Sequence, residues 1–290
     1  MRVILKTAVA ALSLISFAGA AQVHEDFHST YPLSPGGTIS IENQNGPIEI
    51  SSWDSNSVEV TGAKFAKTQE DLSRVQIEIH ATANAISIRT VIPRDSHING
   101  GARYVLHVPR QVNLDKISSS NGGIRIGQTT GTLDARTSNG PIDVDAHEGN
   151  IEADTSNGRI RIELSGGRLK ANTSNAPIEA RLRNPDPSVP VGVTTSNGPI
   201  ALTLDTTTIP AVQASTSNGP IELRIPANAS ARIHAATSNS GIYSDFTFAS
   251  NAAAMSGGGH SMNVANGTVG SGGPSLTLTT SNGPIRILKN

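Results

Sequence analysis

The sequence contains no cysteine, and only nine of its 290 residues are aromatic. The lack of cysteine excludes disulfide bonds, thiolate zinc sites and thiol nucleophiles. Lys and Arg number 22 against 23 for Asp and Glu, so the formal net charge is −1. This balance excludes a dedicated nucleic-acid-binding protein, which needs a basic surface facing the phosphates. Because aromatic rings are so few, the core must be built mainly from other apolar side chains.

Long hydrophobic runs are also absent, except for one near the start. Residues 1–20 have the pattern of a secretory signal peptide, in which Arg2 and Lys6 precede an apolar stretch at 9–17 and small residues at 18–20. The apolar stretch is shorter than the ~20 residues that a transmembrane helix needs. The sequence therefore predicts an exported protein, periplasmic or extracellular, whose mature chain has no transmembrane segment.

A short motif, Ser-Asn usually followed by Gly-Pro-Ile, recurs along most of the chain. Its asparagines are Asn121, Asn139, Asn157, Asn175, Asn197, Asn218, Asn239 and Asn282. Their spacings are 18, 18, 18, 22, 21, 21 and 43 residues, and a similar stretch at 44–48 is an outlier near the start. Repeats of this length are typical of proteins in which each unit stacks on the next.

Each repeat has two alternating segments around a bend. Leu133 and Ala135 alternate with polar residues before the bend at Asn139, and Ile142 and Val144 do so after it. Alternation with a period of two predicts strands with one buried face. Asn-Gly predicts a tight bend, because both residues tolerate a positive φ. Two short strands cannot bury a core alone, so we expect an all-β fold, a parallel β-solenoid with 18–22-residue coils stacked about 4.8 Å apart.

Two columns of equivalent residues support this register. The residue after the isoleucine alternates in sign on four successive coils, as Arg125, Asp143, Arg161 and Glu179. Stacked in register, these side chains would form a weak ladder of surface ion pairs. The second column is the asparagine of the bend, whose amides can hydrogen-bond from coil to coil. We therefore expect the eight asparagines named above to be ladder and turn residues.

The segment before the regular repeats has a different composition. Its aromatic residues are Phe27, Tyr31, Trp53, Phe65 and Tyr104, whereas none lies between Val105 and Ile242. Most of the segment alternates as strands do, and residues 68–75 predict a short helix with Thr68 as its cap. We predict that residues 21–112 form an N-terminal β-rich cap over the open end of the solenoid. Residues 113–290 then form the solenoid, with a Gly- and Ser-rich excursion at about 249–274.

These features together resemble a known family. They are the serial Thr-Ser-Asn-Gly-Pro-Ile units, the opening stretch at 37–43 with 45–48, Val108-Pro109-Arg110 before the first regular coil, and the stretch at 266–274. Over nearly the whole mature chain, the sequence is similar to the bacterial putative-adhesin family, domain of unknown function 4097. The resemblance implies an exported β-repeat protein and brings no catalytic residues. Some similar domains belong to cell-envelope stress systems.

A polysaccharide lyase or hydrolase is the enzyme class that a long solenoid suits, because its groove fits an extended sugar. Hydrolysis needs two carboxylates at a set separation. The candidates are Asp143 and Asp145 after the bend, and Asp134, Glu152 and Asp154 before it. Asp134 and Glu152 fall in one column and can attract a cation, whereas Arg136 beside Asp154 would neutralise the patch. This stretch also lacks the aromatic platforms on which sugars stack.

Other chemistry finds little support in the sequence. The serine before each Asn-Gly recurs in every coil, which favours a role in the bend over a role as nucleophile. The histidines are His24, His28, His80, His97, His107, His147, His234 and His260. None has metal-ligand spacing on a helix, and the stretch at 24–28 is expected to be a solvated tail able to bind a divalent metal only adventitiously. The Gly-Gly-x-Gly-x-Asp units of calcium-binding repeats are missing. We therefore predict no catalytic, metal or cofactor-binding residues.

The function expected from the sequence is that of an exported, non-enzymatic surface or envelope protein that binds, as an adhesin does, through its solenoid face. Its partners would be cell-envelope glycans or surface proteins. Three alternatives stay open at this point: a component that senses cell-envelope stress, a passive envelope protein, and a polysaccharide-active β-helix enzyme.

Overall fold

The computed structural model of the protein describes residues 22–93, 98–248 and 263–290. The predicted signal peptide, much of the Gly- and Ser-rich excursion, His97 and His260 lie outside the described residues. The chain divides into two compact units between Gly140 and Pro141. The described part is all-β, with mostly parallel strands and one short helix. That helix is too short to cross a membrane.

The first unit consists of strands and one short helix, which lies beside β1 and β4. Its elements are β1 (Val23–Pro32), β2 (Thr38–Asn43), β3 (Ile48–Trp53), β4 (Ser57–Ala66), α1 (Gln69–Arg74), β5 (Gln76–Ala81), β6 (Ala85–Val91), β7 (Gly101–Pro109), β8 (Asn113–Ser119), β9 (Ile124–Ile126) and β10 (Thr130–Thr137). The predicted helix is confirmed, because the Thr68 side chain accepts a hydrogen bond from the Asp71 N–H at 3.1 Å.

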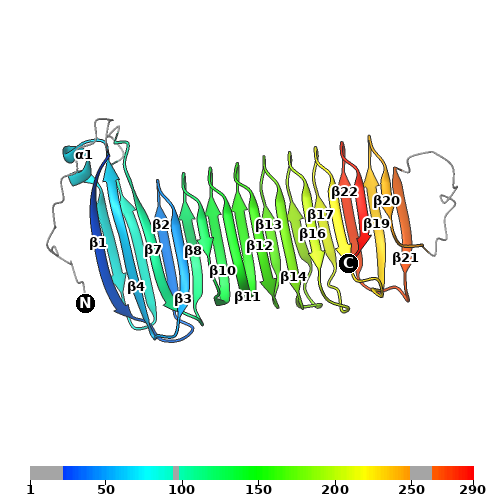
Figure 1. Cartoon of the computed structure of the whole chain (residues 1–290), viewed down its shortest axis with the longest axis horizontal. Coiled ribbons are helices and arrows are strands. Elements are labelled where there is room, and N and C mark those ends of the chain that lie inside the picture. The colour runs from blue at the N-terminus through cyan, green and yellow to red at the C-terminus, as the bar shows by residue number, and fades with distance from the viewer. Residues whose placement is uncertain (1–21, 94–97, 249–262) are drawn as a thin grey trace. The chain divides into compact units, whose positions relative to one another are not determined.

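The strands of the first unit form two rows. Within each row the strands pair in parallel, and one end of each row carries antiparallel strands. One row runs β6–β2–β8–β10, and β5 pairs antiparallel with β6. The other runs β7–β3–β9, and β4 and then β1 add to it antiparallel. The repeat of β2 and β3 thus lies between two repeats that come later in the chain, as the blue strands among cyan and green ones in Figure 1 show.

The second unit, residues 141–290, continues the same pattern of short strands. Its elements are β11 (Ile142–Thr155), β12 (Ile160–Ser165), β13 (Leu169–Asn172), β14 (Ile178–Arg183), β15 (Val191–Thr194), β16 (Ile200–Leu204), β17 (Val212–Ser215), β18 (Ile221–Ile225), β19 (Ala231–Thr237), β20 (Ile242–Ser244), β21 (Val264–Val269), β22 (Ser275–Thr280) and β23 (Ile285–Lys289).

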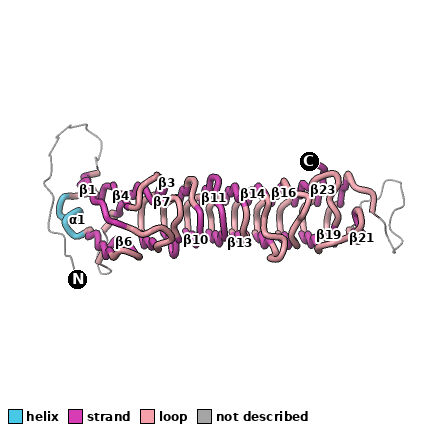
Figure 2. The backbone as a smooth tube through the Cα atoms, turned by 90° about the horizontal axis from the view of Figure 1, so that it is seen from below, coloured by secondary structure: helices cyan, strands magenta, loops and turns pink. Residues whose placement is uncertain are grey.

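Two parallel rows again carry the pairing of the second unit. The strands after the bends run β11–β12–β14–β16–β18–β23–β20, and those before the bends run β11–β13–β15–β17–β22–β19, with β11 long enough to join both rows. Figure 2 shows the two rows on opposite sides, with β14 and β16 on one and β13 and β19 on the other. Strand β21 closes the second row by pairing antiparallel with β19.

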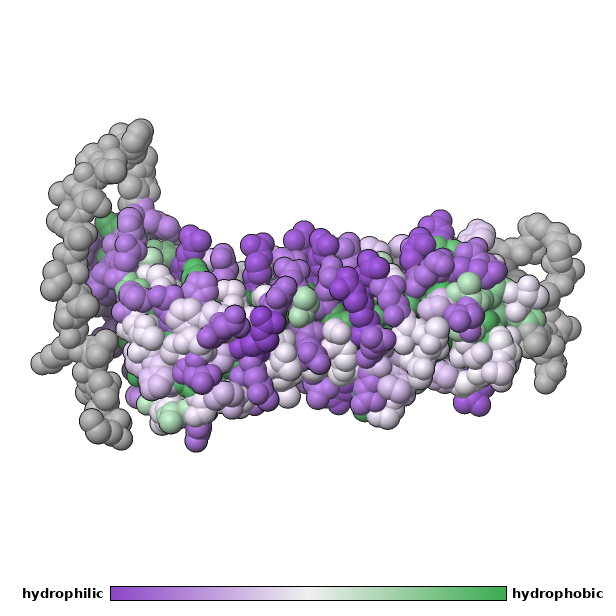
Figure 3. Space-filling view, turned by 60° about the horizontal axis from the view of Figure 1, so that its bottom comes forward, coloured by the Kyte–Doolittle hydropathy of each residue, from purple (hydrophilic) through white to green (hydrophobic). Residues whose placement is uncertain are grey.

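Aliphatic side chains aligned across the strands form the cores. Ile160, Ile178, Ile200 and Ile221 pair in successive strands, and all are at most 1% exposed. The inward positions predicted around the bend at Asn139 are confirmed, because their side chains are at most 2% exposed. Outward positions are mainly polar, and hydrophilic side chains cover most of the face drawn in Figure 3. The low aromatic content follows from a narrow interior that suits aliphatic chains.

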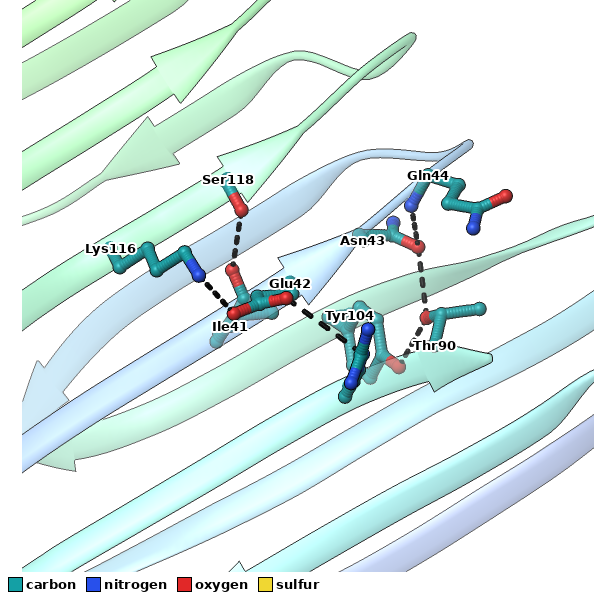
Figure 4. Close-up of polar contacts among 9 residues, drawn as sticks. Ile41, Glu42, Asn43, Gln44, Thr90, Tyr104, Lys116 and Ser118 are labelled. Carbon is teal, nitrogen blue, oxygen red and sulfur yellow. Dashed lines mark hydrogen bonds and ion pairs between the residues drawn. The ribbon is translucent and has the colours of Figure 1, made fainter. Parts of the chain in front are cut away.

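A buried polar cluster joins β2, β6 and β7 in the first unit (Figure 4). The Asn43 Oδ1 atom accepts hydrogen bonds from the Thr90 hydroxyl and the Gln44 N–H, at 2.9 and 3.0 Å. The Thr90 hydroxyl also lies 2.7 Å from the hydroxyl of Tyr104, which is fully buried beside Phe27. Each buried side chain of this cluster has a hydrogen-bonding partner. This avoids the free-energy cost of burying an unpaired polar group.

Burial of Tyr104 makes the stability of the protein fall at alkaline pH. Burial is the larger effect and raises the pKa of Tyr104 from 10.0 to about 12, although the hydrogen bond with Thr90 acts in the opposite direction. The unfolded chain therefore loses this proton from pH 10 upward, whereas the folded protein holds it until about pH 12. This contribution to the free energy of unfolding is complete below pH 10. It is lost as the pH rises to 12, where the free energy of unfolding has fallen by about 2 kcal/mol. Urea unfolding at pH 9 and pH 12 measures it.

The Tyr104→Phe variant is the control for this alkaline loss. It removes the ionising group and keeps the ring that contacts Phe27. Its free energy of unfolding at neutral pH should fall by about 1 kcal/mol, the net value of one hydrogen bond. Its stability should then decline less than that of the natural protein between pH 10 and 12. Equal declines in both proteins would contradict the assignment to Tyr104.

Candidate functional site

The predicted asparagines lie in line at the bends. In the first unit, the Asn139 Nδ2 atom donates to the Asn121 Oδ1 atom at 2.8 Å, and Asn121 donates in the same way to Asn45 at 2.6 Å. In the second unit the order is Asn157, Asn175, Asn197, Asn218, Asn282 and Asn239, with donor–acceptor distances of 2.7–2.9 Å. Asn45, an outlier in the sequence, therefore belongs to the first ladder, and Asn282 precedes Asn239 in the second.

A ladder of buried hydroxyls runs beside the asparagines. The threonine two residues before most of these asparagines donates to a main-chain carbonyl at a neighbouring bend, as Thr216 does to Gly198 at 3.0 Å and Thr280 to Gly219 at 2.9 Å. Before Asn121 the residue is Ser119, which donates to the Gly46 carbonyl at 3.1 Å. Asn43 occupies the same position in the β2 repeat, and its amide reaches the Ala102 carbonyl at 2.7 Å. The sequence analysis missed this ladder, although the Thr-Ser-Asn-Gly pattern was its signal.

The bends differ from the tight turns that the sequence predicted. Among the glycines of the described motifs, only Gly46 has a φ in the left-handed region, at +117°, and none of the motif asparagines has one. The glycines are needed for another reason, which is close packing of the main chain. A Cβ atom built on Gly219 would lie 2.0 Å from the Gly198 carbonyl oxygen, and one on Gly283 would lie 2.0 Å from that of Gly219.

The asparagine ladder should contribute measurably to stability. Asn218 both donates to Asn197 and accepts from Asn282, at 2.7 Å in each case. Replacing Asn218 by Leu removes both bonds and leaves two amides without their ladder partner, so we expect the free energy of unfolding to fall by about 1–2 kcal/mol. Thermal unfolding followed by circular dichroism measures the change. The exposed neighbour Ser217, changed to Ala, should lose less than about 0.5 kcal/mol, and equal losses would contradict the ladder.

Four of the five carboxylates considered for glycoside hydrolysis contact cations or an amide. Asp143 lies 3.2 Å from the Arg159 guanidinium, and Asp134 lies 2.9 Å from the Arg136 guanidinium. Glu152 lies 2.8 Å from the Lys170 ammonium. Asp154 accepts a hydrogen bond from the amide of Asn172 at 2.7 Å, and Asp145 is exposed. The register aligns Asp143, Arg161 and Glu179 in one column, as the alternation of charge predicted. The arrangement therefore places three of the candidate carboxylates in ion pairs and one beside an amide.

The histidines divide between surface and core. The stretch at 24–28, expected to be a solvated tail, is part of strand β1 and pairs with β4. His147 is fully buried in the second unit. His80 is exposed, and His234 lies 2.5 Å from the Asn266 Oδ1 atom on the surface. Over residues 22–93, 98–248 and 263–290, the histidines and carboxylates form no group of three arranged to hold a metal ion.

A polar row crosses the outward face of the first unit, from β3 through β7 and β4 to β1. The Ser51 hydroxyl lies 2.9 Å from the Nδ1 atom of His107, whose Nε2 atom is 4.0 Å from the Glu59 carboxylate. The other Glu59 oxygen is 3.0 Å from the Nε2 atom of His28. The His28 side chain is exposed, with 59% of it accessible, and the His107 side chain is half-buried, with 43% accessible.

Trp53 lies at the edge of this row. Its ring stacks on that of His107, with the centroids 5.7 Å apart and the planes 27° from parallel. The indole N–H donates to the Ser57 carbonyl at 2.8 Å, which fixes the orientation of the ring. We call Ser51, Trp53, Glu59, His107 and His28 the Trp53 patch. It combines a partly exposed indole, two imidazoles and a carboxylate on a rigid sheet, a set that can hydrogen-bond and stack but offers no enclosed cavity.

Comparisons with known proteins give only distant likenesses. No protein-family model matches the chain, and no curated protein matches it. A putative adhesin from Bacteroides fragilis is 11% identical, with 91% of this chain and 97% of that chain covered and a TM-score of 0.45. A putative lipid binding protein from Parabacteroides distasonis is 12% identical over 91% of this chain and 96% of that one, with a TM-score of 0.35. With such low TM-scores, these likenesses carry no argument about function.

Proposed function

We propose that this chain is an exported, non-enzymatic surface protein of the putative-adhesin family, folded as a parallel β-solenoid, that binds extended glycans through the Trp53 patch. Export is supported by the signal-like pattern at residues 1–20, and family membership by the serial Thr-Ser-Asn-Gly-Pro-Ile units. The solenoid is supported by parallel strands that pair equivalent residues of different repeats, as Ile160 pairs with Ile178 and Ile178 with Ile200.

The observation that carries the proposal is the stacked pair of Trp53 and His107 beside Glu59. The apolar face of a sugar ring packs on an aromatic ring, and its hydroxyls need donors and acceptors at the ring edge. Here the indole is partly exposed, and the Glu59 carboxylate and two imidazoles lie along the row. Because strands hold all of these groups, little conformational entropy is lost when a ligand binds.

The contacts of the candidate acids in the second unit favour binding over catalysis. Ion pairs occupy the candidate acids of the second unit, such as Asp143 with Arg159 and Glu152 with Lys170. Glycoside hydrolysis requires one acid that stays protonated and a second that faces it across the bond to be broken. Here each of these two carboxylates contacts a cation instead of a second carboxylate. Such a surface suits reversible contact with a polar polymer.

The single tryptophan makes the proposal directly testable. Trp53 is the only tryptophan in the sequence, so fluorescence excited selectively at tryptophan reports on the patch alone. Titration of the full mature chain with N-acetylglucosamine oligosaccharides should change the Trp53 emission. In a pull-down, purified peptidoglycan should retain the protein. Trp53→Ala should abolish retention, and His107→Ala should weaken it about tenfold or more, the effect of removing one central contact.

A matched control distinguishes binding at the Trp53 patch from non-specific binding to exposed aromatic side chains. Tyr243 is an exposed aromatic residue, 58% accessible, in the second unit. Tyr243→Ala should bind as the natural protein does. Unchanged fluorescence together with no retention on peptidoglycan, glycans or whole cells would overturn the proposed function. Retention that Tyr243→Ala weakens and Trp53→Ala does not would move the binding site away from the Trp53 patch.

A further inference from the structure

The last repeat of the chain does not lie at the end of the second unit. Strand β22 pairs on one side with β17 and on the other with β19. Strand β23 lies in the same way between β18 and β20. Residues 275–290 therefore fill a slot between two repeats that precede them in sequence. Their inward side chains, such as Leu278 and Ile285, are fully buried there.

The two walls of this slot are in the same register. Val212 of β17 and Ile233 of β19 both pair with Leu276, and Ile221 of β18 and Ile242 of β20 both pair with Ile285. The bend of the last repeat also bonds to both walls, because Asn282 donates to Asn218 and accepts from Asn239, at 2.7 Å each. Main-chain pairing and the asparagine ladder thus hold the last repeat on both sides of the slot.

A short crossover of glycines leads into the slot. Residues 270–274 connect β21 on one edge of β19 to β22 on its other edge. The crossover must span two strand spacings, about 9.6 Å. Gly270, Gly272 and Gly273 have φ values of +60°, +81° and +153°, a conformation that other residues rarely adopt. The link therefore folds back in its present form and, being glycine-rich, can also extend.

We propose that residues 275–290 exchange between two copies of this chain, so that each last repeat fills the slot of its partner. The exchanged dimer keeps every contact of the slot, because the same segment occupies the same walls. Only the crossover changes, from a folded-back link to an extended one. The cost is that of bringing two chains together, which makes the dimer favoured at high protein concentration. The inference does not depend on the proposed function, although a dimer would present two Trp53 patches and gain avidity.

A pair of cysteines reports which chain fills the slot, and the natural chain has no cysteine to interfere. Ser215 of β17 and Thr279 of β22 are paired neighbours, a separation that a disulfide can bridge. The full mature chain carrying Ser215→Cys and Thr279→Cys is refolded at low and at high concentration and oxidised. Non-reducing electrophoresis then separates an internal disulfide from one that joins two chains.

Thr194→Cys with Ser215→Cys is the matched control, because these residues pair between β15 and β17, which exchange does not separate. We expect covalent dimers from the Ser215–Thr279 pair at high concentration, about tenfold more than from the control, since exchange is bimolecular. Internal disulfides alone at every concentration would overturn the proposal. Equal dimer yields from the two pairs would also overturn it, because they would show contact that does not involve residues 275–290.

A second variant tests the crossover itself. Deleting Gly272 and Gly273 leaves three residues, which can span at most about 11 Å and must therefore be almost fully extended to cover the two strand spacings. A strained crossover favours the extended, exchanged form. Size-exclusion chromatography with light scattering should then show mainly dimer for the deletion variant. A folded deletion variant that stays monomeric would contradict exchange, and so would one that unfolds without forming dimer.

Discussion

Ending the chain at Pro274 is expected to unfold much of the second unit. The truncation removes β22 and β23, and with them four fully buried side chains, Leu276, Leu278, Ile285 and Ile287. Burial of each stabilises the fold by about 2 kcal/mol, so the loss approaches 8 kcal/mol as an upper estimate. That is comparable to the whole stability of an ordinary domain, about 5–15 kcal/mol. Thermal circular dichroism and limited proteolysis of the truncated chain measure the effect.

The position of the last repeat makes this loss larger than in a simple stack. Had residues 275–290 been the outermost repeat, their removal would expose one neighbouring edge and leave the rest intact. Because β22 lies between β17 and β19, removal exposes both. The outward residue Thr277, changed to Ala, is the control and should alter the free energy of unfolding by less than about 0.5 kcal/mol. A truncated chain that melts as the natural one does would mean that β19 closes directly onto β17.

Sequence order could not reveal this insertion. All repeats carry the same signals, so their pattern predicts which residues face inward but not which repeat lies beside which. Asn218 and Asn239 are 21 residues apart, the same spacing as Asn197 and Asn218, and direct stacking was the simplest interpretation. The structure places Asn282 between Asn218 and Asn239. The same limit applies to Asn45, which lies beside Asn121 although a long segment separates them in the chain.

The local features were predictable where a single segment carries the signal. Thr68 with Asp71 marked the helix start, and the alternation around Asn139 marked the inward side chains. The Trp53 patch was not predictable, because its members come from four strands. Glu59 reaches His107 only because β4 pairs antiparallel with β7, and the sequence holds no register signal for that pairing. Chain export, the absence of catalysis and the domain boundary at residue 112 stay predictions.

Replacing Gly219 by Val is expected to lower the free energy of unfolding by about 3 kcal/mol, the upper part of the usual range for overpacking. A Cβ atom on Gly219 would lie 2.0 Å from the Gly198 carbonyl oxygen and 2.9 Å from the Pro199 nitrogen. Both contacts are with main chain, so no side chain can rotate away. The neighbouring repeat must then move, which weakens the bond from the Thr216 hydroxyl to that same carbonyl. Urea unfolding at neutral pH measures the loss.

Gly192→Val is the matched control, because Gly192 lies on the outward face of β15 with no atom within 4 Å of a Cβ built there. Valine favours strands and reduces the freedom of the unfolded chain, so this variant should be neutral or more stable by up to about 1 kcal/mol. Ala176 occupies the equivalent bend position in another repeat, so one methyl group can be accommodated where the neighbours are built around it. The valine side chain at Gly219 is larger than this methyl group and needs more space. If both valine variants lose the same stability, the loss at Gly219 comes from restricted backbone freedom. Close packing against the neighbouring carbonyl would then not be its cause.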